Sequence, residues 1–520
     1  MLHLKKLNRT LIKLPKRLFS QANDISRVPL SESLGFDTLP SAGKQTSSEA
    51  RNAAWHSTQI TRLENGLTVV TEPHFGQYCT IGVAINSGSR FEYGYPFGIS
   101  HVIEKMAFGS SQNFPSRNDI FAVLEKSGGI IDCQTTRDTA MFAASCHVNG
   151  VDSLVDILAN AVWKPNINDE EVKAAATTAS YEIEDLKLRI DCAPLIADYI
   201  HQAAFSGNTL GYSKYVTEET ARSISVEQVA TYLSQIHTPE RMVVAGVGVD
   251  HETFVLSVKH HFNQAECTWN KNPEFLLPKV PEIDNSLAQY TGGEFIVPAD
   301  LSKVGIGTPY PLLAHVVLGF ESVSYTDDDF VPFCVLQSLL GGGGSFSAGG
   351  PGKGMYARLY TDVMNRCPWI YSATAQNHSY ADAGVFTIHA SCPPQNLNDA
   401  LIVITDQFLR LQHGTEREEL ERAKTQLKSH LMMNLEVRPV LFEDLARQVL
   451  GHGTRKTPDE YVARIEKVTN NDIIRIADKM LSSKASFAAY GEVDTLSPYK
   501  KIEEAAAKRT CKPLFPNKYW

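Results

Sequence analysis

Three residues in the segment GISHVIEKMAFGS, residues 98–110, have the spacing of a zinc-peptidase motif. His101 and Glu104 stand where the inverted motif H-x-x-E-H places its first zinc ligand and its general base. The second histidine of that motif is replaced by Lys105. On a helix, residues three and four positions apart share a face, so the three side chains are expected to point into one site.

Lys105 decides what chemistry this site can do. An active site of this kind needs two neutral imidazoles on zinc, a carboxylate that takes a proton from bound water, and a third ligand from a distant segment. A protonated lysine has no lone pair and repels a dication. Glu182 and Glu184 in ASYEIEDLK are the candidates for the third ligand, and Glu182 could instead form an ion pair with Lys105. We therefore predict a degenerate site without metal, in which His101 alone is most simply a structural histidine.

The elements that must hold this site occur twice along the chain. Gly66 matches Gly293 and Asp250 matches Asp494, so the offset grows from 227 to 244 residues without any reversal of order. The matching segments are 65–73 with 292–300, 82–89 with 316–323, 141–158 with 385–404, and 243–250 with 487–494. Four ordered pairs indicate an internal duplication, whereas any single pair would be unconvincing.

Each half contains strands, then helical stretches such as residues 169–189 and 416–436, then strands. This order predicts an α+β fold with two duplicated sandwich halves, in which helices cover mixed, mainly antiparallel sheets. The predicted domains are a transit peptide (1–19), a loosely ordered lead-in (20–58), an N-terminal domain with the degenerate motif (59–267), a linker (268–290) and a C-terminal domain (291–520).

The first residues are basic and contain no acid before Asp24. Interleaved Leu and Ile with six Lys and Arg indicate a mitochondrial transit peptide, although a disordered basic arm is the alternative. Cleavage near Ser20 would change the formal charge from −9 to −15, because six bases and no acids are removed. A chain this acidic is a poor nucleic-acid binder and a plausible host for a basic ligand.

Composition argues against a membrane-spanning protein and against a secreted protein held by disulfides. The apolar runs are strand-sized and fall short of the roughly 18 residues of a membrane span, so no transmembrane segment is expected. The nine cysteines are scattered, odd in number and without a C-x-x-C pair, which predicts reduced thiols in a compartment outside the secretory pathway.

A glycine-rich segment follows residue 340 in the second half. It has eight glycines in the fourteen residues 341–354. The spacing fails the nucleotide-loop test, because Ser347 stands where the first glycine of G-x-x-x-x-G-K is needed. A flexible linker is one reading, but the segment lies inside the half, and glycines allow backbone to approach a peptide closely. Phe346 could contact a ligand or equally tether the loop.

The segments Gly88–Phe114 and Tyr181–Ser213, together with the duplicated halves, resemble the pitrilysin-type metallopeptidases of family M16. The resemblance covers nearly everything after about residue 60. In this family, the β subunit of a two-subunit peptidase keeps the full motif and holds the catalytic zinc, whereas its partner carries a degenerate version. By resemblance, Lys105 occupies the position of the second histidine ligand of an active family member, and Glu182 occupies the position of its distal glutamate ligand.

The resemblance implies a non-catalytic, substrate-recognising subunit in the mitochondrial matrix, without a cofactor of its own. Its partner would be the zinc-bearing β subunit, and its ligands basic presequence peptides of imported precursors. The substrate-binding loop implied by the resemblance comprises Gly341, Gly342, Gly343, Gly344, Ser345, Phe346, Ser347, Gly349, Gly350, Gly352, Lys353 and Gly354. A core scaffold subunit of the respiratory bc1 complex is the alternative, which the full glycine loop disfavours. Lys105 disfavours an autonomous metallopeptidase.

Overall fold

The computed structural model describes residues 57–190, 192–304, 311–344 and 355–515. These residues belong to one compact unit, Trp55–Trp520. The predicted transit peptide, and the lead-in up to residue 56, lie outside the described residues, as does the part of the glycine-rich segment from 345 to 354.

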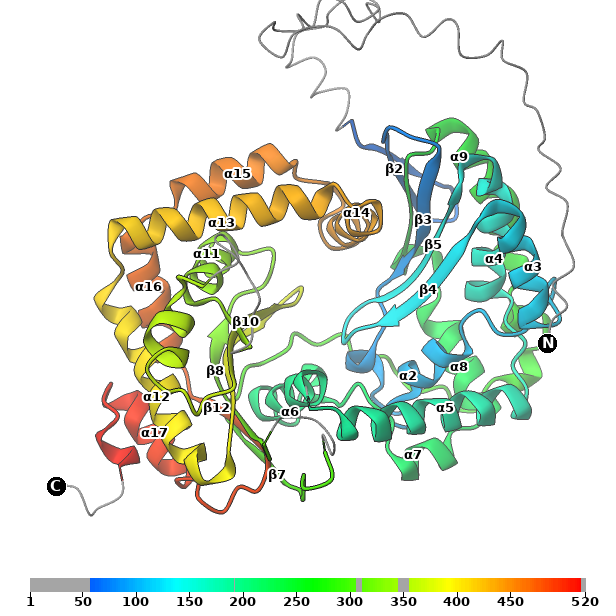
Figure 1. The fold of residues 1–520 in the computed structure, drawn as a ribbon. Helices are drawn as coiled ribbons and strands as arrows, with labels where there is room; N and C mark the ends of the chain where they lie inside the picture. The colour runs from blue at the N-terminus through cyan, green and yellow to red at the C-terminus, as the bar shows by residue number, and fades with distance from the viewer. Residues whose placement is uncertain (1–56, 191, 305–310, 345–354, 516–520) are drawn as a thin grey trace, which may run out of the picture. The chain divides into compact units, whose positions relative to one another are not determined.

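Two six-stranded sheets form the framework (Figure 1). The first has the order β1-β2-β6-β3-β5-β4, with strands β1 Gln59–Arg62, β2 Thr68–Glu72, β3 Tyr78–Ile85, β4 Ile130–Thr135, β5 Ala140–His147 and β6 Met242–Val247. The second has the order β7-β12-β8-β11-β10-β9, with strands β7 Gly293–Pro298, β8 Ala314–Ser322, β9 Gly342–Gly344, β10 Ser372–Ser379, β11 Gly384–Cys392 and β12 Ser486–Gly491.

Five strands of each sheet follow the same topology. β2 pairs parallel with β6, and the remaining pairs β6–β3, β3–β5 and β5–β4 are antiparallel. The second sheet repeats this pattern with the parallel pair β7–β12 and the antiparallel pairs β12–β8, β8–β11 and β11–β10. The predicted duplicated α+β fold with mainly antiparallel sheets is therefore confirmed. The sixth strands differ, since β1 joins β2 at one edge and β9 joins β10 at the other.

Helices cover both sheets (Figure 1). Those of the first half are α2 Ile99–Met106, α3 Arg117–Ser127, α4 Val151–Trp163, α5 Asp169–Leu188, α6 Ala193–Ala204, α7 Glu218–Ser223, α8 Val226–Ile236, α9 His251–His261 and α10 Thr268–Lys271. Those of the second half are α11 Phe330–Leu340, α12 Leu397–Arg410, α13 Arg417–Leu435, α14 Arg438–His452, α15 Pro458–Lys467, α16 Asn470–Leu481 and α17 Tyr499–Ala507. The predicted helices at 169–189 and 416–436 correspond to α5 and α13.

Two helices cover the sheet of the other half. α6, from the first half, packs on β7, β8 and β12, and α14, from the second half, packs on β3 and β6. The sequence fits this exchange, because Gly82 in the middle of β3 leaves room for α14: a Cβ there would lie 2.5 Å from the ring of Phe442. Separate apolar clusters form where α6 and α14 meet these sheets.

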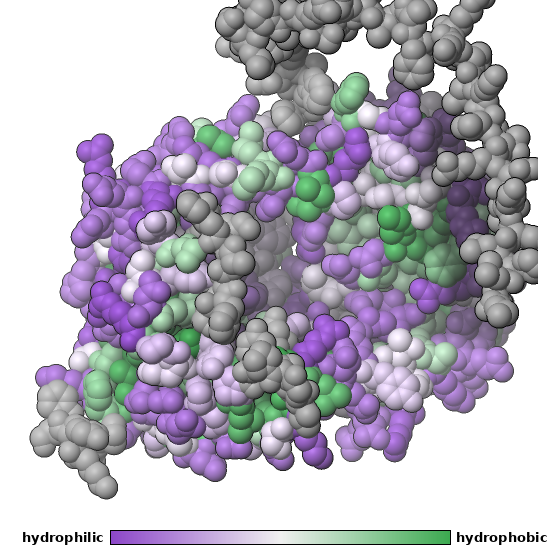
Figure 2. Space-filling model, in the orientation of Figure 1, coloured by the Kyte–Doolittle hydropathy of each residue, from purple (hydrophilic) through white to green (hydrophobic). Residues whose placement is uncertain are grey.

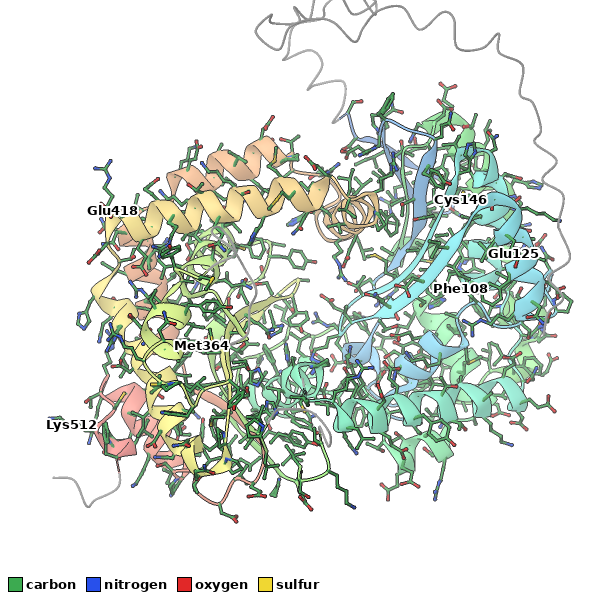
Figure 3. All side chains as sticks on the ribbon, in the orientation of Figure 1. Phe108, Glu125, Cys146, Met364, Glu418 and Lys512 are labelled. Atoms are coloured by element: carbon green, nitrogen blue, oxygen red, sulfur yellow. The ribbon has the colours of Figure 1, made fainter. Side chains whose placement is uncertain are left out.

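Side chains sort by layer. Phe108, Cys146 and Met364 are buried, while Glu125 and Glu418 are exposed on outward helix faces (Figure 3). The face in Figure 2 is mostly hydrophilic, with apolar side chains in small separate groups. None of the described helices is both long and apolar enough to cross a membrane. All nine cysteines are free thiols.

Candidate functional site

The N-terminus of α2 fixes the position of the motif. Gly98 is the N-cap, with a φ of 86°, and a Cβ at this position would lie 2.4 Å from the Cα of Val216. Only glycine fits this left-handed turn against a neighbouring backbone. The carboxylate of Glu92 accepts hydrogen bonds from Gly98 N (2.6 Å), Ser100 N (2.9 Å) and the Ser100 hydroxyl. It thereby satisfies free N–H groups at the start of the helix.

Glu92 is fully buried, and this burial raises its pKa to about 7 against the opposing effect of its hydrogen bonds. Glu92 helps to position the motif, and the motif did not identify it. An isolated glutamate in GSRFEYGYPFG carries no spacing signal, and its role follows only from the folded turn.

His101, Lys105 and Glu182 meet as the sequence predicted. Lys105 Nζ lies 2.5 Å from Glu182 Oε2 and 2.7 Å from Glu104 Oε1. His101 Nε2 lies 3.1 Å from the same Glu182 Oε2. The expected ion pair between Lys105 and Glu182 is present, and α5 supplies Glu182, whereas Glu184 on the same helix is exposed.

Further contacts fix the two ends of this cluster. The second carboxylate oxygen of Glu104 accepts a hydrogen bond from Thr135 N at 2.7 Å, at the end of β4. Val216 N donates to His101 Nδ1 at 3.4 Å, and Tyr215 packs edge-on against the imidazole. Because Nδ1 accepts this bond, we assign the hydrogen to Nε2, which donates to Glu182. The donors Thr135 N and Val216 N were not predicted, because backbone donors leave no side-chain pattern in a sequence.

The charges of the cluster stabilise one another. The hydrogen bond from His101, followed by the interaction with Lys105, lowers the pKa of Glu182 to about 2 against the effect of burial. Burial alone would lower the pKa of Lys105, but the carboxylates of Glu104 and Glu182 outweigh it and raise the pKa. Lys105 is therefore an ammonium ion at neutral pH.

The same side chains are close enough together to surround a metal ion. One ligand atom from each of His101, Glu104 and Glu182 can be chosen so that all lie within 4.8 Å of one another, which is compact enough for a metal ion. However, the Lys105 ammonium bonds to both carboxylates, and the Nε2 of His101 carries a hydrogen directed at Glu182. The cluster already contains its cation, so the residues present do not fit a zinc ion.

The glycine-rich segment begins as a strand. Gly341 ends α11 with a φ of 58°, and Gly342–Gly344 form β9, which pairs with β10. A Cβ on Gly342 would lie 2.0 Å from the carbonyl oxygen of Ala373. The first glycines are thus required by the packing of the chain itself. The remaining predicted loop residues lie outside the described residues: Ser345, Phe346, Ser347, Gly349, Gly350, Gly352, Lys353 and Gly354.

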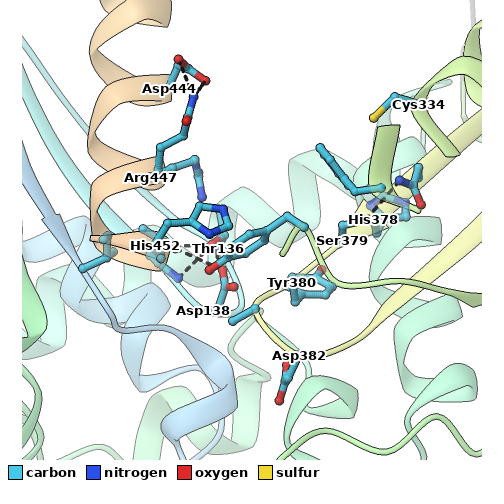
Figure 4. Close-up of a pocket in the computed structure, with 18 of the residues that line it drawn as sticks. Thr136, Asp138, Cys334, His378, Ser379, Tyr380, Asp382, Asp444, Arg447 and His452 are labelled. Atoms are coloured by element: carbon cyan, nitrogen blue, oxygen red, sulfur yellow. Dashed lines mark hydrogen bonds between the residues drawn. The ribbon is translucent and has the colours of Figure 1, made fainter. Parts of the chain in front are cut away.

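A cavity of about 890 Å³ lies between the hairpins that end β4 and β10 and helix α14 (Figure 4). Arg447 and His452 of α14 line one side, and Tyr380 of the second hairpin lines another. Arg90 donates two hydrogen bonds, of 3.1 and 2.7 Å, to the nearly buried carboxylate of Asp382. This bidentate pair joins the two halves at the cavity wall.

Comparisons with known proteins show which family the chain resembles. The family model "Insulinase (Peptidase family M16)" matches residues 68–218, and "Peptidase M16 inactive domain" matches 223–427. The chain is 57% identical to mitochondrial-processing peptidase subunit alpha of Caenorhabditis elegans, covering 88% of this chain and 89% of the relative. It is 44% identical to the human subunit alpha, covering 95% and 92%. The probable subunit alpha of Schizosaccharomyces pombe is 33% identical, covering 84% of each chain.

The fold and the site define an M16-type peptidase chain in which the ammonium group of Lys105 takes the place of a zinc ligand. With this identity over most of its length, the chain belongs to the family of mitochondrial-processing peptidase alpha subunits.

Proposed function

We propose that this chain recognises presequences for a partner β subunit, which binds the zinc and cleaves the peptide bond. The chain is the non-catalytic member of the mitochondrial processing peptidase pair, which removes presequences in the matrix. The proposal adds the division of labour: the β subunit supplies zinc and the general base, and this chain supplies the glycine-rich segment and part of an acidic surface for basic presequences.

The arrangement of Lys105 carries the proposal. An ammonium ion that bonds to Glu104 at 2.7 Å and Glu182 at 2.5 Å occupies both carboxylates that a hydrolytic site would need free. Neither carboxylate can then act as a general base without losing its ion pair. This chain therefore contributes to turnover through binding and positioning of the substrate.

The glycine-rich segment is the proposed contact with the presequence. Its first residues leave α11 through Gly341 and run along the edge of the second sheet as β9. A backbone without side chains at a sheet edge can approach an extended peptide closely. Deletion of residues 341–350 would remove these substrate contacts without touching Lys105 or the partner's zinc.

The test uses three preparations: the purified chain alone, the chain with a zinc-bearing β subunit, and that complex after deletion of residues 341–350. Zinc content and cleavage of a basic presequence peptide are measured for each. We expect the chain alone to be inactive and the complex to cleave only with the segment present. Matched unfolding curves and equal binding to the β subunit control for misfolding of the deletion variant.

Two results would contradict the proposal. Zinc-dependent cleavage by the chain alone would show that Lys105 does not block the site. Equal cleavage by the complex with and without residues 341–350 would assign presequence recognition elsewhere and favour a scaffold role for this chain.

A further inference from the structure

The two sheets differ at corresponding edges. β4 is the last strand of the first sheet, but its counterpart β10 is covered by the additional strand β9. Among the described residues, no strand pairs with the outer side of β9. β9 consists of three glycines, whereas the exposed edge of β4 carries Asp132. Charged side chains and prolines commonly protect sheet edges, and β9 has neither.

The register shows which backbone groups face outward. Ala375 N donates to Gly341 O at 3.0 Å, and the pairing continues through Ala373 with Gly343. Hydrogen-bonded and non-hydrogen-bonded pairs alternate along an antiparallel ladder. Gly343 therefore directs its N–H and C=O toward β10, whereas Gly342 and Gly344 direct theirs toward the open edge.

β9 carries no side chains that could cover its own outer edge. Gly342 has a φ of 110°, and no side chain fits between its Cα and the carbonyl of Ala373. Gly341 is packed against Ala357 in the same way, since a Cβ on Gly341 would lie 2.5 Å from the Cβ of Ala357. The strand is thus fixed on its inner side by close packing, and within the described part of the chain its outward peptide groups pair with no further strand. This is the arrangement used when a peptide adds to a sheet.

We propose that an extended segment of the precursor adds to β9 as a further strand of the second sheet, paired with the outward peptide groups of Gly342 and Gly344. This inference rests on the proposed role of the glycine-rich segment and specifies its binding mode. Backbone pairing of this kind selects an extended conformation and leaves side-chain sequence free. Two peptide residues at positions i and i+2 would provide the matching N–H and C=O groups.

The first test changes only the ligand. A fluorescein-labelled peptide with the sequence of residues 8–24 of this chain is bound to the full complex, after a chelator has removed zinc to prevent cleavage. The peptide is then N-methylated at one residue at a time. We expect binding to weaken about tenfold at two positions two residues apart, and to change less than about twofold at the residue between them.

The second test changes only β9. Gly344→Pro removes an outward N–H and leaves the pairing of Gly343 with β10, so peptide affinity should fall about tenfold. Gly344→Ala retains the N–H and should bind within about twofold of the unchanged complex. Unfolding curves and binding to the β subunit are compared for both variants. If Gly344→Pro does not fold, hydrogen exchange on the unchanged complex decides, since bound peptide should protect the amides of Gly342 and Gly344 but not Gly343.

The outcomes separate this inference from the proposed function. Strand addition at β9 is overturned if N-methylation changes peptide affinity equally at every position. It is also overturned if the Gly344→Pro and Gly344→Ala complexes bind the peptide equally. If deletion of residues 341–350 still abolishes cleavage in that case, the recognition role stands without it. If the deletion has no effect, both fail. Self-association of the chain that Gly344→Pro abolishes would identify a second copy as the occupant and would also overturn the inference.

Discussion

Replacement of Lys105 by histidine tests whether a single ammonium ion keeps zinc out. Lys105→His restores an imidazole one helical turn after His101 and removes a positive charge from between Glu104 and Glu182. The site would then have two imidazoles and the Glu182 carboxylate as ligands, the donor set of a catalytic zinc centre, with Glu104 in the position of the general base. We expect the variant to bind zinc and the natural sequence to bind none measurably.

The size of the effect follows from the geometry. Zinc bound to Glu182 Oε2 would lie at most about 4.6 Å from Lys105 Nζ, because Nζ is 2.5 Å from that oxygen and a Zn–O bond is about 2.1 Å. A dication and a monocation at this separation repel by about 7 kcal/mol at an effective dielectric constant of about 20. This corresponds to about five powers of ten in affinity. Lys105→Met should recover this electrostatic term without adding a ligand.

Zinc affinity is measured by equilibrium dialysis with metal analysis, and the absorption spectrum of bound cobalt reports the coordination geometry. The order of affinity should be Lys105→His, then Lys105→Met, then the natural sequence. The double variant His101→Ala with Lys105→His should fall back toward Lys105→Met, which shows that both imidazoles are ligands. If folded Lys105→His binds zinc no better than the natural sequence, the reasoning from Lys105 is wrong.

Three further perturbations address the framework around the site. Arg90→Met leaves the nearly buried carboxylate of Asp382 without its partner and should destabilise the chain by about 3 kcal/mol, measured as a shift of the urea midpoint. Gly342→Ala places a Cβ 2.0 Å from Ala373 O and should reduce presequence cleavage by the complex at least about tenfold. The pKa of Glu92 is raised to about 7, so the native state holds a proton more tightly than the unfolded state. Stability should fall by about 3 kcal/mol as pH rises from 4.5 through 7, and Glu92→Gln should lose this slope.

Each of these has a matched control. Arg222→Met breaks an exposed ion pair with Glu218 and should cost less than about 0.5 kcal/mol. If Arg90→Met loses no more free energy of unfolding than Arg222→Met, the buried ion pair contributes no more to stability than the exposed one. Gly207→Ala, where nothing lies within 4 Å of the added Cβ, controls for glycine replacement at positive φ. A pH slope that persists in Glu92→Gln would assign the titration to another group.

The sequence predicted those features that depend on spacing. Ordered repeats such as Gly66 with Gly293 identified the duplication, because a repeated strand retains its length and its apolar pattern. The pairing of Lys105 with Glu182 was predictable because two opposite charges stood where two ligands of one metal would be. The domain boundaries remain predictions, and Trp269, placed in the linker, is buried in the core of the first half.

Other features depend on contacts that no local pattern encodes. The turn at Gly98 requires the neighbouring backbone of Val216, which lies more than a hundred residues away in the sequence. Glu92 caps α2 only after that turn has formed. The resemblance to the family implied that the whole glycine-rich segment is a loop, but its first glycines form β9 in spite of the low strand propensity of glycine, because β10 offers a partner. Tertiary pairing overrides propensity in this case.

The exchange of α6 and α14 has a consequence for the origin of the two halves. The two halves repeat one topology, but either half on its own would expose an apolar sheet surface that the other half now covers. Fragments ending at the linker should therefore aggregate when expressed separately and become soluble when expressed together. A proteolytic cut between the halves should leave them associated, because duplication has left repeated topology but no independent modules.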